Sequence, residues 1–124
     1  MKSLAAVTFL VRDYDEAIGW FSRCLGFKLI EDTPLSESKR WVVMALPGPG
    51  GTHLIFAKVA DAPRAAGGRV AFFLHTDDFD RDHTAMMAAG VTFRETPRHE
   101  AYGTVAEFED LYGNGWDLIE PAAI

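Results

Sequence analysis

The 124-residue chain repeats one pattern of residues at a fixed distance. Leu10–Gly26 contains the end of an apolar run, an aspartate, a short stretch with helical spacing and a glycine, and Leu74–Gly90 contains the same succession. Both the first aspartate and the closing glycine are displaced by 64 residues. Two copies are too few for a solenoid, so the repeat predicts a pseudo-symmetric domain of two modules with something held between them.

The first copy reads as one strand, one helix and three further strands. The helix is expected to begin after Asp13 or Asp15 and to end at Gly26, because Asp caps helix N-termini and Gly favours the C-terminal turn. Asp32–Lys39 is polar and is predicted to be a loop. The expected strands, from their apolar or alternating residues, are Leu4–Val11, Phe27–Glu31, Trp41–Leu46 and His53–Val59.

The second copy has the same order of elements. Its helix is expected to be capped by Asp77 or Asp78, and Pro97–Tyr102 is predicted to be a loop. The expected strands are Val70–His75, Val91–Glu95, Thr104–Glu109 and Trp116–Glu120. We therefore expect one α+β domain over 1–124, with a module at about 4–59, a linker at about 60–68 and a module at about 69–121. The two βαβββ modules should form a cupped mixed sheet with helices on the outside.

Charge and composition narrow the class of partner. The formal net charge is −6, from 18 acidic and 12 basic residues without a basic run, which argues against binding to nucleic acid or to an anionic membrane. The chain has one cysteine and no apolar run of membrane-spanning length. We expect a cytoplasmic protein without a membrane partner.

Two stretches resemble the vicinal oxygen chelate superfamily, which includes glyoxalase I, bleomycin-resistance proteins, fosfomycin-resistance enzymes and extradiol dioxygenases. The first is Val11–Phe27, and the second is Phe108–Pro121, which is similar to the closing hairpin of the family except that Leu111 replaces the usual proline. The resemblance covers nearly the whole chain. It implies two βαβββ modules that form a cup, and a homodimer.

The resemblance also implies which positions could hold a metal. Enzymes of the family bind a divalent metal through one side chain on the first strand and one on the last strand of each module. The matching first-strand positions are Ala6 and either Val70 or Ala71, none of which can ligate a metal. The matching last-strand positions are His53 and Asp117, which are 64 residues apart and so expected to be equivalent. We expect no metal ligands and no cofactor, or Zn, Ni, Fe or Mn if the protein is an enzyme.

Six residues are candidates for lining a pocket, and none is assigned a catalytic role. The alternative for His53, Glu107 and Asp117 is a solvent-facing strand surface, and for His75 it is structural hydrogen bonding at the sheet rim. The default for each aromatic residue is the core. Specificity is expected in the loops at Asp32–Lys39 and Pro97–Tyr102. The candidates are Trp41, His53, Phe73, His75, Glu107 and Asp117.

Three functions are consistent with this pattern. The first is a homodimeric protein that binds a small organic ligand in its cup without a tightly held catalytic metal, as implied by resemblance to the bleomycin-resistance branch. The alternative is a glyoxalase-like lyase or isomerase that uses a divalent metal or a His/carboxylate pair such as His53 and Asp117. The third is a scaffold whose sheet face is filled by a partner subunit.

Overall fold

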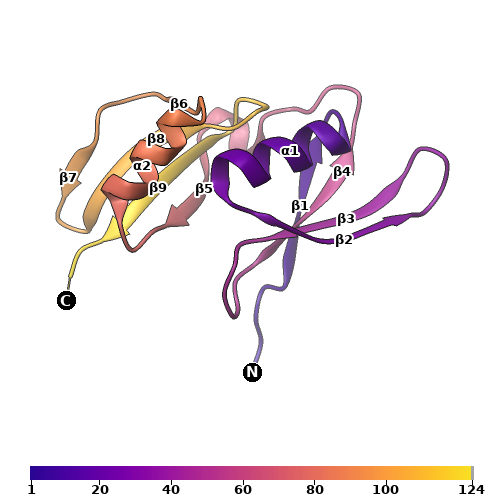
Figure 1. Cartoon of the computed structure of the whole chain (residues 1–124), viewed down its shortest axis with the longest axis horizontal. Helices are drawn as coiled ribbons and strands as arrows, with labels where there is room; N and C mark the ends of the chain where they lie inside the picture. The colour runs from indigo at the N-terminus through magenta and orange to yellow at the C-terminus, as the bar shows by residue number, and fades with distance from the viewer. Residues whose placement is uncertain (124) are drawn as a thin grey trace. The chain divides into compact units, whose positions relative to one another are not determined.

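The computed structural model describes residues 1–123 and contains two compact units, one over residues 1–63 and the other beginning at Arg64. Each unit is a mixed four-stranded sheet with one α-helix, and the second unit has one additional short strand. Figure 1 shows the elements of both units along the chain. The predicted α+β fold with a repeated βαβββ module is therefore confirmed.

The first unit begins with β1 (Ala6–Val11) and α1 (Tyr14–Leu25) and continues into three strands. The strand order in its sheet is β1-β4-β3-β2, with β1 and β4 parallel and the other pairs antiparallel. The three strands after the helix are β2 (Lys28–Pro34), β3 (Arg40–Ala45) and β4 (His53–Lys58).

Helix α1 has the capping residues that its sequence predicts. Asp13 is the N-cap, and its carboxylate accepts a hydrogen bond of 2.8 Å from the Glu16 N–H. Gly26 follows the helix with φ of 77°, the left-handed conformation that glycine adopts without a steric penalty. Phe21 is fully buried, and its ring centroid lies 5.1 Å from that of Phe9 and 5.4 Å from that of Phe56. These aromatic contacts attach the helix to one face of the sheet.

The second unit repeats this topology. After the short 3₁₀ turn η1 (Ala65–Gly68), its strand order is β5-β9-β8-β6, again with one parallel pair, and β7 pairs with β8. Asp78, rather than Asp77, caps its helix by accepting a hydrogen bond from the Arg81 N–H. The elements are β5 (Val70–His75), α2 (Phe79–Ala88), β6 (Thr92–Phe93), β7 (Arg98–Glu100), β8 (Gly103–Glu109) and β9 (Gly115–Pro121).

Two segments predicted as loops contain strand residues, and that part of the prediction is wrong. Asp32–Pro34 continues β2, because its backbone pairs with β3 and the Asp32 carboxylate binds Arg40 at 2.6 Å. Arg98–Glu100 forms β7 on β8. Both segments are mainly polar edge strands, so they lack the apolar alternation by which a half-buried strand is recognised.

A substitution at Gly103 tests how closely strands β8 and β9 approach each other. Its φ is 149°, and an added Cβ would lie 2.2 Å from the backbone oxygen of Glu120 on the paired strand. Gly103→Ala is therefore expected to lower the free energy of unfolding by about 2 kcal/mol or more, because the two backbones must separate. Denaturant unfolding measures the loss. Gly19→Ala is the control, since Gly19 lies within α1 with open space around it. This substitution should stabilise the protein by about 0.5 kcal/mol. Equal stability of the Gly103 variant and the parent would contradict the close approach.

Candidate functional site

One face of the first sheet lacks a covering helix within its unit. Leu54 and Phe56 of β4 are buried beneath α1, whereas the alternate residues Ile55 and Ala57 are half-buried on the opposite side. The β3–β4 register places Val43 beside Ile55 on that side. We call this side, formed by Trp41 and Val43 of β3 and by His53, Ile55 and Ala57 of β4, the open face.

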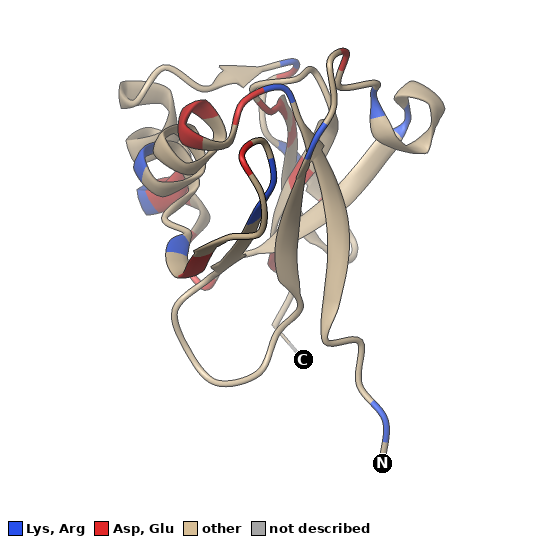
Figure 2. Cartoon of the chain, turned by 90° about the vertical axis from the view of Figure 1, so that its right-hand side faces the viewer, with Lys and Arg blue, Asp and Glu red and all other residues tan. Residues whose placement is uncertain are grey.

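The open face is largely apolar. Strands β1, β3 and β4 carry charged side chains only at the ends, at Arg40 and Lys58. Figure 2 shows that long strand segments are uncharged, and that charged positions lie on helices, on turns and on the remaining strands. Trp41 retains 38% of its surface exposed. An apolar surface of this kind is typical of a site for an organic molecule.

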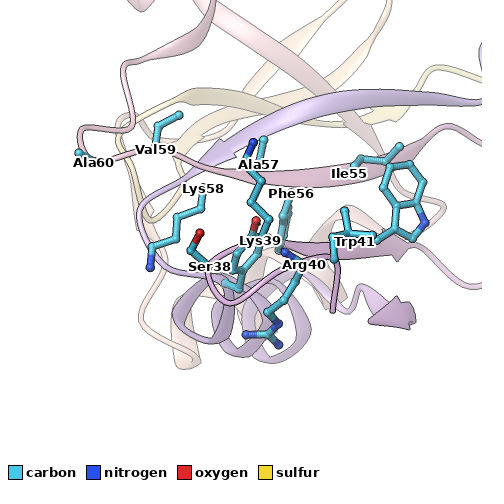
Figure 3. A pocket seen from close by; sticks show the side chains of 12 residues that line it. Ser38, Lys39, Arg40, Trp41, Ile55, Phe56, Ala57, Lys58, Val59 and Ala60 are labelled. Carbon is cyan, nitrogen blue, oxygen red and sulfur yellow. Dashed lines mark hydrogen bonds between the residues drawn. The ribbon is translucent and has the colours of Figure 1, made fainter. Parts of the chain in front are cut away.

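A pocket of about 540 Å³ lies at one end of the open face (Figure 3). Its wall includes Trp41 and Ile55, and residues of the β2–β3 turn complete it. Pockets that hold drug-sized ligands have volumes of about 300–1,000 Å³, so this one is large enough for such a molecule. The lining residues are Tyr14, Leu35, Ser38, Lys39, Arg40, Trp41, Ile55, Phe56, Ala57, Lys58, Val59 and Ala60.

Arg40 fixes the side of the pocket next to α1. Its guanidinium Nη2 binds the Asp32 carboxylate at 2.6 Å and the Asp15 carboxylate at 3.0 Å. The Arg40 guanidinium also lies 5.1 Å from the centre of the Tyr14 ring. The backbone N–H of Arg40 donates a 3.3 Å hydrogen bond to the Tyr14 hydroxyl. Hydrogen bonding to Arg40 lowers the pKa of Asp32, so this carboxylate is ionised at neutral pH and offsets the arginine charge.

The second sheet brings together four of the six predicted site residues. Phe73 of β5 and Glu107 of β8 are both register partners of Asp117 on β9, so the three side chains share one sheet face. His75 lies two residues beyond Phe73 on the same face. Of the other two, Trp41 lines the pocket of the first unit, whereas His53 lies on the open face but not among the lining residues.

Asp117 is the unusual group on the second sheet. It is 9% exposed, and its Oδ1 has no hydrogen-bond partner among the described residues. Burial raises the pKa of this carboxyl; the charge of Arg98 opposes the rise, and those of Glu107 and Glu95 add to it. Glu107, in contrast, is paired with Arg94 at 2.7 Å. Buried carboxyl groups of this kind are concentrated at functional sites.

Asp117 should make stability depend on pH. Because its folded-state pKa is raised above the ordinary value of 3.8, ionisation is less favourable in the folded state, and stability falls as the pH rises through the folded pKa. Asp117→Asn is therefore expected to stabilise the fold by about 1 kcal/mol at pH 7, with the gain shrinking as the pH falls below the folded-state pKa and absent below the ordinary pKa. Urea unfolding of both proteins from pH 3 to pH 8 measures it. A variant that is destabilised at pH 7 would contradict this account.

His53 and Asp117 are not equivalent positions, which corrects the expectation from the 64-residue offset. Val43 and Glu107 are 64 residues apart and equivalent, and their strand partners are Ile55 and Asp117 respectively. The structural counterpart of Asp117 is therefore Ile55, and His53 lies two residues nearer the hairpin turn. The difference arises because the β3–β4 connection is two residues longer than the β8–β9 connection between equivalent pairs.

The side chains at the family's metal positions do not form a four-ligand set. Ala6 is the register partner of His53 and its side chain has no donor atom, and the side chains of Val70 and Ala71 also have none. Among residues 1–123, no three His, Cys, Asp or Glu side chains are grouped closely enough to hold a metal ion. The expectation that the protein holds no catalytic metal tightly stays a prediction. No helix in the same residues is long and apolar enough to cross a membrane.

The two βαβββ units, each with one sheet face not covered by its own helix, define a class of protein. The chain belongs to the Glyoxalase/Bleomycin resistance protein/Dioxygenase superfamily, whose family model matches residues 3–118. The resemblance identified from the sequence is thereby confirmed.

Individual relatives are similar over nearly their full lengths. An uncharacterised protein of Shewanella frigidimarina is 46% identical, covering 96% of this chain and 93% of that protein. The crystal structure of TnmS3, an antibiotic-binding protein from Streptomyces sp. CB03234, superposes with a TM-score of 0.80 at 27% identity, covering 98% of both chains. The bleomycin resistance determinant encoded on transposon Tn5 has a TM-score of 0.70 at 19% identity, covering 98% of this chain and 100% of that one, and shows a shared fold.

Proposed function

We propose that the protein binds a planar organic molecule in the pocket of the first unit and does so as a binding protein rather than an enzyme. The observation that carries the proposal is the half-exposed indole of Trp41 beside the apolar side chain of Ile55 in a pocket of about 540 Å³ (Figure 3). An aromatic side chain at the wall of an apolar pocket stacks on a flat ligand. The similarity to TnmS3, which is described as an antibiotic-binding protein, supports this class of function.

The proposal includes binding without a tightly held catalytic metal. Its support is the chemistry of the family's metal positions, where Ala6 and either Val70 or Ala71 supply no ligand atom. An isolated imidazole or carboxylate rarely holds a first-row metal tightly.

We also propose that the protein acts as a cytoplasmic homodimer. Sedimentation velocity would test the dimeric state. Exposed apolar residues on β2, Leu29 and Ile30, support an association surface.

Thermal unfolding of chelator-treated protein tests the proposed function. Binding to the folded state alone raises apparent stability by about 2.7 kcal/mol at a ligand concentration of 100 Kd. We expect members of a panel of flat bicyclic and tricyclic aromatic compounds to raise Tm by several degrees, and size-matched acyclic compounds not to. Adding Zn, Ni, Fe or Mn should leave the aromatic affinities unchanged. A requirement for one metal ion per chain would overturn the proposal.

A second function, a glyoxalase-like lyase or isomerase, is favoured by Asp117. A buried carboxyl with a raised pKa and an unbonded oxygen is suited to proton transfer. If the protein is an enzyme of this kind, Asp117→Asn should abolish turnover while leaving ligand affinity within about twofold. A loss of affinity with unchanged turnover would contradict a catalytic role for Asp117.

A further inference from the structure

We propose that the ligand of the first unit's pocket is an aromatic carboxylate, whose ring lies against Trp41 and whose negative charge is held by Lys39 and Lys58. This inference rests on the proposed function and adds the charge of the ligand. The pocket lining contains three cationic side chains and no Asp or Glu, although acidic residues outnumber basic ones 18 to 12 in the whole chain. The local charge is therefore opposite in sign to that of the protein.

The three cationic side chains of the pocket lining differ in whether they have an ion-pair partner. Arg40 is held by the carboxylates of Asp15 and Asp32, so its charge is already offset. Lys39 and Lys58 have no ion-pair partner among residues 1–123. These two ammonium groups are consequently available to an anion that enters the pocket.

The positions of the lysines fit a ligand with an apolar end and a charged end. Figure 3 shows the Trp41 indole beside Ile55 at one end of the pocket and Lys58 toward the other end, with Lys39 between them. A flat ring at Trp41 would place a ring substituent in the direction of the lysines. A carboxylate is the simplest such substituent, since it accepts charge-assisted hydrogen bonds from ammonium groups.

The backbone that carries Lys39 is held in place. The Lys39 carbonyl accepts hydrogen bonds from the Leu35 N–H at 2.8 Å and from the Ser36 N–H at 3.1 Å, and the Lys39 N–H donates to the Ser36 hydroxyl at 3.2 Å. The neighbouring Arg40 is anchored to α1 by Asp15. Because the turn is already restrained, it loses less conformational entropy when a ligand binds than an unrestrained loop would lose. This lower entropic cost favours ligand binding by Lys39.

The test uses three probes with one ring system and different charge: 2-naphthoate, 2-naphthamide and (2-naphthyl)methylammonium. Calorimetry on the full chain should give about tenfold tighter binding for the naphthoate than for the amide, and the weakest binding for the ammonium compound. The preference should decrease as salt rises from 20 to 300 mM, because the ammonium groups are exposed to solvent.

A matched set of variants assigns the preference to the two lysines. The double variant Lys39→Gln/Lys58→Gln should bind the naphthoate and the amide within about twofold of each other. The single variant Lys28→Gln is the control, since Lys28 is an exposed lysine of β2 that does not line the pocket. It should retain the full preference for the naphthoate. The charge-conserving variant Lys39→Arg/Lys58→Arg should keep most of the preference that the Gln double variant loses.

The possible results separate this inference from the proposed function. Equal affinities for naphthoate and amide in the parent protein would overturn the inference that the ligand is negatively charged, but not the proposal of an aromatic-binding site. A preference that survives in the double variant, or that is lost equally in Lys28→Gln, would also overturn it. Failure of all three probes to bind at millimolar concentration would overturn both the inference and the proposed function.

Discussion

Asp110→Ala is expected to lower the free energy of unfolding by about 3 kcal/mol or more, the largest stability effect predicted for this chain. The Asp110 side chain is buried in the β8–β9 turn and accepts four hydrogen bonds. Its oxygens bind the Tyr112 N–H at 2.8 Å, the Asn114 N–H at 3.0 Å, and the Asn114 side-chain amide and the Trp116 indole N–H at 2.9 Å each. Alanine removes the acceptor from all four donors.

Two further variants make this prediction specific. Asp110→Asn keeps one carbonyl oxygen and should lose less stability than Asp110→Ala. Asp61→Ala removes an exposed aspartate and should change stability by no more than about 0.5 kcal/mol. Urea unfolding followed by far-UV circular dichroism measures all three. An Asp110→Ala variant within about 1 kcal/mol of the parent would show that the hydrogen-bonded turn is not important for stability.

The largest expected effect on binding comes from Trp41→Ala. Replacing an aromatic residue at the centre of a binding site typically costs about 2 kcal/mol or more, which corresponds to an approximately thirtyfold weaker affinity for 2-naphthoate. The fold should be affected less than by a core substitution, because Trp41 is 38% exposed. Calorimetric titration of the variant measures the change in affinity, and thermal unfolding checks that the variant is folded.

Two variants on the same strand and the turn that follows it provide the comparison for Trp41. Trp41→Phe keeps an aromatic ring and should recover part of the affinity. Leu46→Ala removes an apolar side chain with a similar exposed fraction, 39%, that does not line the pocket, and should leave affinity unchanged. Unaltered binding by a folded Trp41→Ala variant would place the ligand elsewhere.

Much of the fold could be predicted because its signals are local. The helix after Asp13 has a capping aspartate, buried apolar positions and a terminal glycine, and each of these is visible in the sequence. Strand β5 was predicted with its observed bounds, Val70–His75, since it is a short apolar run between polar residues. In contrast, β7 carries Arg, His and Glu on an edge, so only its pairing with β8 identifies it as a strand.

The site was predictable only in part. Exposure of the Trp41 indole on a strand is a feature of tertiary packing, and the sequence indicates it only as one aromatic residue among several. Lys39 and Lys58 are ordinary polar residues in the sequence, and only the fold brings them to one pocket from a turn and a strand end. The expected equivalence of His53 and Asp117 was wrong because the strand register depends on hairpin length, which a constant offset does not reveal.

The most direct test of the central claim is a titration of ¹⁵N-labelled protein with 2-naphthoate, followed through the three tryptophan indole N–H signals. Trp41 lines the pocket, whereas Trp116 is buried and donates its indole N–H to Asp110, and Trp20 belongs to α1. We expect the Trp41 signal to shift progressively to saturation, together with the backbone amides of Ile55 to Lys58, while the other two indoles remain in place. Saturable binding without a Trp41 shift, or with shifts concentrated around Asp117, would contradict a ligand site in the first unit.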